Sequence, residues 1–177
     1  MPATGTSVAA EGDLWHSRGR DGKRNFGEME PVLTVLSREQ CLRLMATAPV
    51  GRIIYTRRAM PAVELVNFTV DAGDIVIRTA PSGKLLAAIR GAVVAFEADA
   101  YDPGARSGWS VTAVGHAREV TDPADVGMLR SAGPHPWAPG DHPYFVRITP
   151  GQLTGRYLSA ADSGPAGPGG QAPLPAW

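Results

Sequence analysis

Six strand-like segments without regularly alternating helices are the feature that most restricts how this chain can fold. The segments are rich in β-branched and aromatic residues, and Gly, Pro or Asp residues separate most of them. They cover residues 52–56, 62–70, 75–79, 92–98, 108–120 and 144–149. This order lacks the βαβ repetition of a parallel sheet. It predicts a mainly β fold with short helices, in which six antiparallel strands close as a small Greek-key barrel.

Three short helices are expected around these strands. Before the first strand, Ser37 and Gln40 form a capping-box pattern. Before the last strand, Asp122 and Pro123 are suited to the cap and the first position of a helix. The remaining helix follows the third strand and begins near Ser82.

The turn between the third strand and that helix has the composition of an anion site. Pro81 ends the strand, and the helix start presents free backbone N–H groups and the positive end of the helix dipole. Arg78, Thr79, Ser82 and Lys84 surround this point, which suits a phosphate. An ordinary capped helix with solvated basic residues is the alternative.

Known nucleotide motifs narrow the kind of phosphate. Arg78 and Leu85 stand where a P-loop requires glycine and a hydroxyl residue, and no Gly-x-Gly-x-x-Gly follows a strand. A single phosphate held by side-chain and backbone donors remains, and flavin mononucleotide (FMN) carries such a group.

The second strand offers two polar side chains to a bound ring. Alternation places Asn67 on one face of this strand and Glu64 on the other, each among apolar residues. Both are candidates for ring contacts, although Glu64 also suits a solvent-facing position near a strand end.

Length and charge limit the general class of protein. The chain has 177 residues, of which 44% are hydrophobic, and this suits one domain with one core. We expect an N-terminal arm at 1–31, the domain at 32–158 and a Pro/Gly-rich disordered tail at 159–177. The 17 basic and 17 acidic residues cancel, so neither nucleic acid nor a membrane surface is an expected partner.

Cysteine use and apolar runs indicate the compartment. Cys41 is the only cysteine, which excludes an intramolecular disulfide and a cysteine-based zinc site. No apolar run reaches the length of a membrane span, and the N-terminus lacks the apolar core of a secretory signal. The chain is therefore predicted to be cytoplasmic.

No catalytic residue can be named from the sequence. His116, His135 and His142 are suited to proton delivery near neutral pH. The spacing of His135 and His142 matches no standard metal site, and Ser110 lacks the setting of a nucleophile elbow, so no metal is expected.

A set of short motifs, in order and spacing, resembles one family between about Leu36 and Leu158. It is similar to the pyridoxamine 5'-phosphate oxidase-like split-barrel flavoproteins, in the branch of nitroimidazole-resistance-type and small actinobacterial proteins. The motifs are Leu36–Gln40, Val50–Arg52, Val66–Phe68, the turn from Arg78 to Lys84, Phe96–Asp99, Gly108–Val111 and Gly115–Ala117.

This resemblance implies a homodimer of split β-barrels with FMN in a cleft at the subunit interface. By position, it assigns Thr79, Ser82 and Lys84 to the FMN phosphate, with Arg78 as a weaker member. The remaining predicted cofactor contacts are Glu64, Val66 and Asn67 along the isoalloxazine, and Trp109 and Ser110 at the border of the cleft. For Trp109, packing in the core or an interface is the alternative.

The implied function is an FMN-dependent oxidoreductase acting on a small molecule. The segment 153–157 does not match the substrate-phosphate residues of true pyridoxamine phosphate oxidases, so vitamin B6 oxidation is not expected. Two alternatives stay open: a reductase of the same fold that uses a deazaflavin coenzyme, and a flavin-binding or redox-sensing module without turnover. The substrate and the electron donor are not determined by the sequence.

Overall fold

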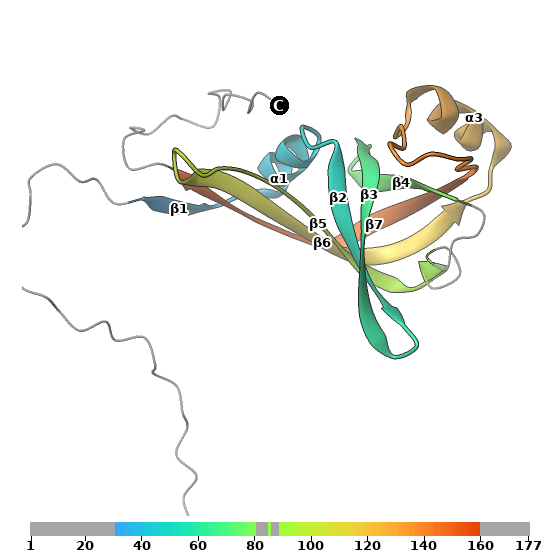
Figure 1. Ribbon diagram of the computed structural model, residues 1–177, viewed down its shortest axis with the longest axis horizontal. Coiled ribbons are helices and arrows are strands. Elements are labelled where there is room, and N and C mark those ends of the chain that lie inside the picture. Colours follow the sequence, from blue (N-terminus) through green and yellow to red (C-terminus); the bar gives the residue numbers. More distant parts are fainter. Residues whose placement is uncertain (1–30, 81–84, 86–88, 160–177) are drawn as a thin grey trace, which may run out of the picture.

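Figure 1 shows the computed structural model, which describes residues 31–80, 85 and 89–159. Seven strands and two labelled helices make up this part of the chain. They are β1 (Val32–Val35), α1 (Arg38–Met45), β2 (Val50–Arg57), β3 (Met60–Asp71), β4 (Asp74–Thr79), β5 (Val93–Asp102), β6 (Ser107–Val120), α3 (Pro123–Ala132) and β7 (Tyr144–Ser159). The predicted arm and tail lie outside the described residues except for Pro31 and Ser159, so that domain division stays a prediction.

Six strands close into the predicted antiparallel barrel. Their order is β7-β4-β3-β2-β5-β6, and a further pairing of β6 with β7 completes the ring. The strands β2, β3 and β4 follow one another as neighbours, and β5 then returns to lie beside β2, which is the Greek-key arrangement. The mainly β, split-barrel prediction is therefore confirmed.

The seventh strand, β1, is absent from the sequence prediction. It pairs with the last four residues of β7, and all four of its own side chains are exposed. A four-residue segment with no buried side shows no alternation, so only its pairing with a distant strand reveals it.

Three strands extend beyond their predicted ends. Residues 99–107 lie between two of the predicted strands, but β5 continues to Asp102, where it pairs with the start of β6 at Ser107. The strand β7 was expected to end at Thr149, but it continues through Pro150 to Ser159. Proline is accommodated there because the β6–β7 register shifts between Val114 and Gly115.

The bulge at Gly115 depends on the missing side chain. A Cβ atom at this position would lie 2.0 Å from the backbone oxygen of Thr149. The two strands approach so closely that no other residue fits without a backbone shift.

The helix ends agree with the sequence prediction. Ser37 and Gln40 form a complete capping box at α1, and Asp122 caps α3 with Pro123 in the first turn. Between β4 and β5, Leu85 and Ile89 are helical and buried, as expected for the apolar side of the predicted helix. The start of that helix lies outside the described residues. Neither of the two labelled helices is long and apolar enough to cross a membrane.

Two clusters of buried side chains hold the barrel and its cover. The larger cluster fills the barrel and includes Ile75 and Ile77 of β4. The smaller one joins Val76, on the other side of β4, to Leu129 of α3 and to Phe145. Strand alternation therefore attaches α3 to the outside of the barrel wall, where Figure 1 shows it over one end of the sheet.

Cys41 belongs to the larger cluster and is fully buried. Burial raises the pKa of its thiol. Cys41 is therefore a small core residue and not a reactive thiol.

Candidate functional site

Part of β3 has a neighbouring strand on only one side. The strand β2 pairs with residues Met60–Asn67 of β3, whereas β4 pairs with Phe68–Asp71. Within the described residues, positions 60–67 therefore leave one row of backbone groups without a strand partner. Unpaired N–H and C=O groups of this kind can bind a ligand or another chain. We call residues 60–67 the β3 edge.

Asn67 holds a proline-rich loop against the β3 edge. Its Oδ1 accepts a hydrogen bond of 2.8 Å from the backbone N–H of Trp137, in the loop 133–143 that follows α3. Its Nδ2 donates to the carbonyl oxygen of Pro49 at 3.1 Å. Both ends of the Asn67 amide are therefore engaged within the protein, which leaves one N–H group and one lone pair for a ligand.

Arg78 holds the other end of the same loop. Its Nε donates to the carbonyl oxygen of His142 at 2.6 Å, and its guanidinium lies 5.2 Å from the centre of the Phe145 ring. Within the loop, Nδ1 of His142 lies 3.0 Å from the carbonyl oxygen of Gly140. Arg78 therefore has a positioning contact that the sequence did not reveal.

The register of β3 and β4 brings Asn67 and Arg78 together. Phe68 pairs with Ile77, and both side chains lie in the barrel core. Asn67 and Arg78 are the adjoining residues, so they lie next to each other on the outer side of the barrel. We call Asn67, Arg78 and the loop 133–143 the corner.

Two other predicted contacts on β3 have side chains directed to the barrel. Val66 is half-buried against the core cluster. The carboxylate of Glu64 accepts a hydrogen bond from the hydroxyl of Tyr55, which is 3% exposed. Burial, followed by this hydrogen bond, raises the pKa of Tyr55. The backbone of Glu64 and Val66, rather than their side chains, belongs to the β3 edge.

The predicted phosphate turn is described only in part. Thr79 is 8% exposed and lies on the same side of β4 as Ile75 and Ile77, opposite Arg78. Ser82 and Lys84 lie outside the described residues. The assignment of these side chains to a phosphate therefore stays a prediction.

The two predicted contacts on β6 lie away from the corner. Trp109 is 9% exposed and is part of the core cluster, which agrees with its alternative role in packing. Ser110 is exposed, and its strand is separated from β3 by β5 and β2. Three strand spacings place it roughly 14 Å away. Within one chain, Ser110 therefore does not join Asn67 at one site.

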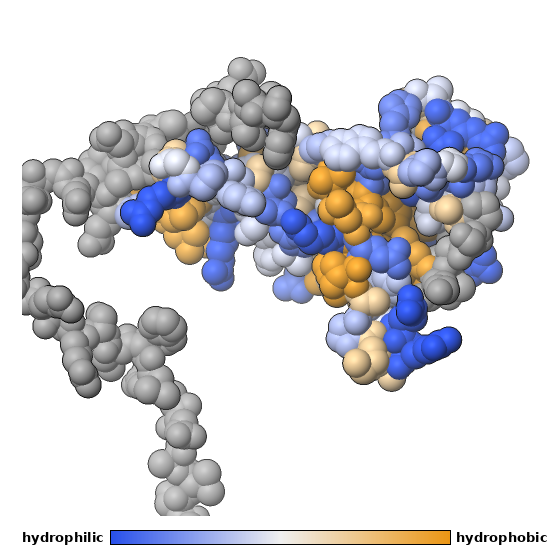
Figure 2. Space-filling model, viewed as in Figure 1, coloured by the Kyte–Doolittle hydropathy of each residue, from blue (hydrophilic) through white to orange (hydrophobic). Residues whose placement is uncertain are grey.

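The outward side of β2, β3 and β5 carries apolar residues and one ionic cluster that the sequence did not reveal. Val63, Leu65 and Val93 are more than half exposed, and Figure 2 shows apolar side chains gathered over the region of β2 and β3. Beside them, Arg52 forms ion pairs with Glu97, at 2.8 Å, and with Asp99. Hydrogen bonds to Asp99 and Glu97 raise the pKa of Arg52. We call this surface, with Ser110 at its far side, the outer sheet face.

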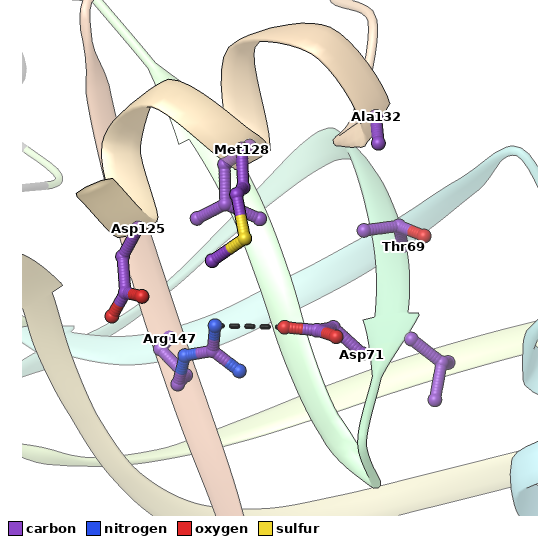
Figure 3. Close-up of a pocket in the computed structure, with 8 residues that line it drawn as sticks. Thr69, Asp71, Asp125, Met128, Ala132 and Arg147 are labelled. Atoms are coloured by element: carbon purple, nitrogen blue, oxygen red, sulfur yellow. Dashed lines mark ion pairs between the residues drawn. The ribbon is translucent and has the colours of Figure 1, made fainter.

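A cavity of about 260 Å³ lies between α3, the end of β3 and Arg147 of β7. Figure 3 shows Arg147 directed toward Asp71, and their ion pair is 2.8 Å long. Burial acts to lower the pKa of Arg147, but the pairs with Asp71 and Asp74 raise it overall. Arg147 therefore connects β7 to the turn between β3 and β4. Among the described residues, no group of three or more His, Cys, Asp or Glu side chains could hold a metal ion.

Comparison with known proteins connects this architecture to one family. The model of the family described as pyridoxamine 5'-phosphate oxidase matches residues 37–157. The chain belongs to the pyridoxamine 5'-phosphate oxidase family. Its match includes every predicted site residue, from Glu64 to Ser110.

Some proteins similar to this chain have a named ligand and others do not. The chain is 40% identical over 125 residues to the uncharacterized protein Rv0080 of Mycobacterium tuberculosis, covering 68% of this chain and 82% of that protein. The FAD binding protein from Mycobacterium smegmatis, whose structure is known, has 34% sequence identity to the chain and a TM-score of 0.61. This match covers 71% of this chain and 98% of that one. A FAD-binding protein from Mesorhizobium loti, at 23% identity and a TM-score of 0.62, shares the fold; the match covers 73% of this chain and 99% of that one.

Proposed function

We propose that the chain binds a flavin nucleotide along the β3 edge and acts as an oxidoreductase on a small molecule. The observation that carries the proposal is the likeness to the FAD binding protein of M. smegmatis, which extends over 98% of that chain. The open backbone of β3 supports it independently, because a flavin ring has a polar edge that can hydrogen-bond to such a strand.

The residues that would hold the flavin come from three segments. Thr79, Ser82 and Lys84 would bind its phosphate, at the turn after β4. The backbone of Glu64 and Val66, together with the remaining N–H group of Asn67, would bind the polar edge of the ring. A bound flavin supplies hydride and electron transfer, while these residues bind and orient it and exclude water.

A second copy of the chain would complete the site. The outer sheet face leaves Val63, Leu65 and Val93 exposed beside the charges of Arg52, Glu97 and Asp99. Apolar surface next to paired charges is suited to a subunit interface. Ser110 lies on this surface, three strands away from β3. We therefore propose a homodimer that packs through the outer sheet face.

FMN is the flavin that the sequence favours, because one phosphate suits the predicted turn. FAD is the second candidate, because the M. smegmatis protein with 34% sequence identity is a FAD binding protein. The deazaflavin coenzyme is a third, because the same turn suits its phosphate. Titration of the purified protein with each of the three separates them.

The visible absorption spectrum of the purified protein tests flavin binding first. We expect a flavin spectrum that survives desalting after FMN or FAD has been added. Protein that retains neither flavin nor the deazaflavin coenzyme would contradict the proposed function. Reduction of the bound flavin by NADH or NADPH with a range of acceptors then separates an oxidoreductase from a flavin-binding module without turnover.

Lys84→Ala tests the phosphate assignment. We expect it to lose bound flavin while circular dichroism and thermal unfolding stay those of a folded protein, because it removes a positive charge that would pair with the phosphate. Arg130→Ala, at an exposed position on α3, is the matched control and should retain flavin. Stoichiometric flavin in Lys84→Ala would show that the phosphate binds elsewhere.

Light scattering of the flavin-loaded protein tests the proposed interface. We expect the wild type to be a dimer. Leu65→Arg should separate it into monomers, and the flavin content should then fall. A monomer that retains flavin would contradict the interface and leave the flavin site intact.

A further inference from the structure

We propose that Trp137 is a stacking residue, whose indole covers the face of a planar heteroaromatic ring bound at the β3 edge. This inference rests on the proposed flavin site and names a residue for it that neither the sequence motifs nor the family resemblance supplied. The shared chemistry is a flat aromatic ring, and both the isoalloxazine and the adenine of a flavin nucleotide provide one.

The side chain of Trp137 is exposed although its backbone is fixed. The indole is one of the largest side chains and is mostly buried in folded proteins, yet the residue is 69% exposed. Its backbone N–H is nevertheless fixed by the 2.8 Å hydrogen bond to Asn67. The hydrogen bond from Asn67 to Pro49 fixes the orientation of that amide in turn. Trp137 is therefore an exposed aromatic residue on an anchored backbone.

The loop that carries Trp137 is stiff. Prolines stand at positions 134, 136, 139 and 143, and each fixes its own φ angle. Arg78 holds the far end of the loop through the carbonyl oxygen of His142. A loop that is already ordered loses little entropy when a ligand binds, so the stacking energy is retained as affinity.

Trp137 lies beside the end of the β3 edge. Asn67 ends the β3 edge, and its neighbour Arg78 precedes Thr79, where the predicted phosphate turn begins. Trp137 is bound to Asn67 and therefore stands beside the backbone that would bind a ring. An aromatic side chain there contributes affinity through its π face and needs no hydrogen bond to the ring.

Flavin titration of the full-length protein tests the stacking role. The variants are Trp137→Ala, which removes the ring, and Trp137→Phe, which keeps a smaller one. Arg130→Ala is the control, because it shortens an exposed side chain on α3, outside the corner, the β3 edge and the outer sheet face. We expect Trp137→Ala to weaken flavin binding roughly tenfold or more, Trp137→Phe to lose less, and Arg130→Ala to bind as the wild type does.

Two further readouts identify the ring. Riboflavin, FMN and FAD are titrated against the same variants: an equal loss for all three assigns the isoalloxazine to Trp137, and a loss for FAD alone assigns the adenine. Flavin should also quench part of the tryptophan fluorescence, and that part should be missing in Trp137→Phe, although three other tryptophans remain.

Asn67 variants test the anchoring of Trp137. Asn67→Asp keeps the oxygen that accepts the Trp137 N–H and should retain most of the stacking, measured by quenching. Asn67→Ala removes the acceptor and should lose it. If Asn67 had only a structural role, Asn67→Ala would be less stable than the wild type but would show the same flavin quenching.

The outcomes separate this inference from the proposed function. If the wild type retains flavin and Trp137→Ala binds each flavin with unchanged affinity, the stacking role is overturned and the flavin site stands. A change in the dimer equilibrium of Trp137→Ala without a change in flavin affinity also overturns it and assigns the indole to the subunit contact. If the wild type binds no flavin, the proposed function fails, and this inference fails with it.

Discussion

The β6–β7 seam and the corner are neighbouring parts of one barrel that are held together in different ways. The seam is a backbone ladder that runs from Gly108 paired with Leu158 to Val120 paired with Phe145. At the corner, the β3–β4 ladder covers only Phe68–Asp71. Beyond it, side-chain hydrogen bonds from Asn67 and Arg78 hold the loop 133–143.

This difference separates what folds the molecule from what shapes its candidate site. A backbone ladder accepts many side chains, but it fails when the backbone itself cannot follow its path. The corner depends on a few polar side chains on the outside of a barrel whose core is complete without them. The loop that presents Trp137 can therefore change without loss of the barrel.

The largest effect is expected at the seam. Gly115→Ala would place a Cβ atom 2.0 Å from the backbone oxygen of Thr149, so the ladder must shift. We expect it to lower the free energy of unfolding by about 3 kcal/mol, or to prevent folding. Urea unfolding measures the loss.

Gly151→Ala is the control for that experiment. It lies on the β7 side of the same bulge, where a Cβ atom would be 3.8 Å from the backbone oxygen of Val114. We expect a change within about 0.5 kcal/mol. Equal stability of the two variants would mean that the seam is not the rigid part of the molecule.

An intermediate effect is expected at the corner. Arg78→Met removes the hydrogen bond to the His142 carbonyl and the cation above Phe145. The expected loss is about 2 kcal/mol, with faster hydrogen exchange in residues 133–143 and unchanged protection of the seam. Arg130→Met, on the exposed surface of α3, should change neither. Faster exchange throughout β6 and β7 would remove the distinction between the two regions.

The smallest effect is expected from loss of the hydrogen bond between Tyr55 and Glu64, away from the corner on β3. Tyr55→Phe removes the hydroxyl that donates to Glu64, at a cost of about 1 kcal/mol near pH 7. Because the pKa of Tyr55 is raised in the folded state, the neutral phenol stabilises the fold below about pH 10, and this contribution declines as the pH rises further.

Unfolding of both proteins between pH 7 and pH 11 tests this. The stability difference between the wild type and Tyr55→Phe should shrink at the alkaline end. A difference that stays constant over this range would mean that Tyr55 gains nothing from its neutral form in the fold.

The elements with local signals were predictable from the sequence alone. The capping box of Ser37, the helix cap of Asp122 and six of the strands follow from residues within a few positions of one another. The strand predictions also placed Asn67 on β3 and Arg78 on β4, the two strands at the candidate site. These features depend on backbone propensity and on periods of two or four residues, which a sequence displays directly.

The contacts of those side chains depend on the folded barrel. Asn67 finds Trp137, 70 positions away, and Arg78 finds His142, 64 positions away. The strand β1 exists because β7 continues past Pro150 to meet it, and Trp109 lies in the core because its side of β6 faces the barrel. Contacts of this kind arise from barrel closure, which brings distant segments together and leaves no periodic signal in either one.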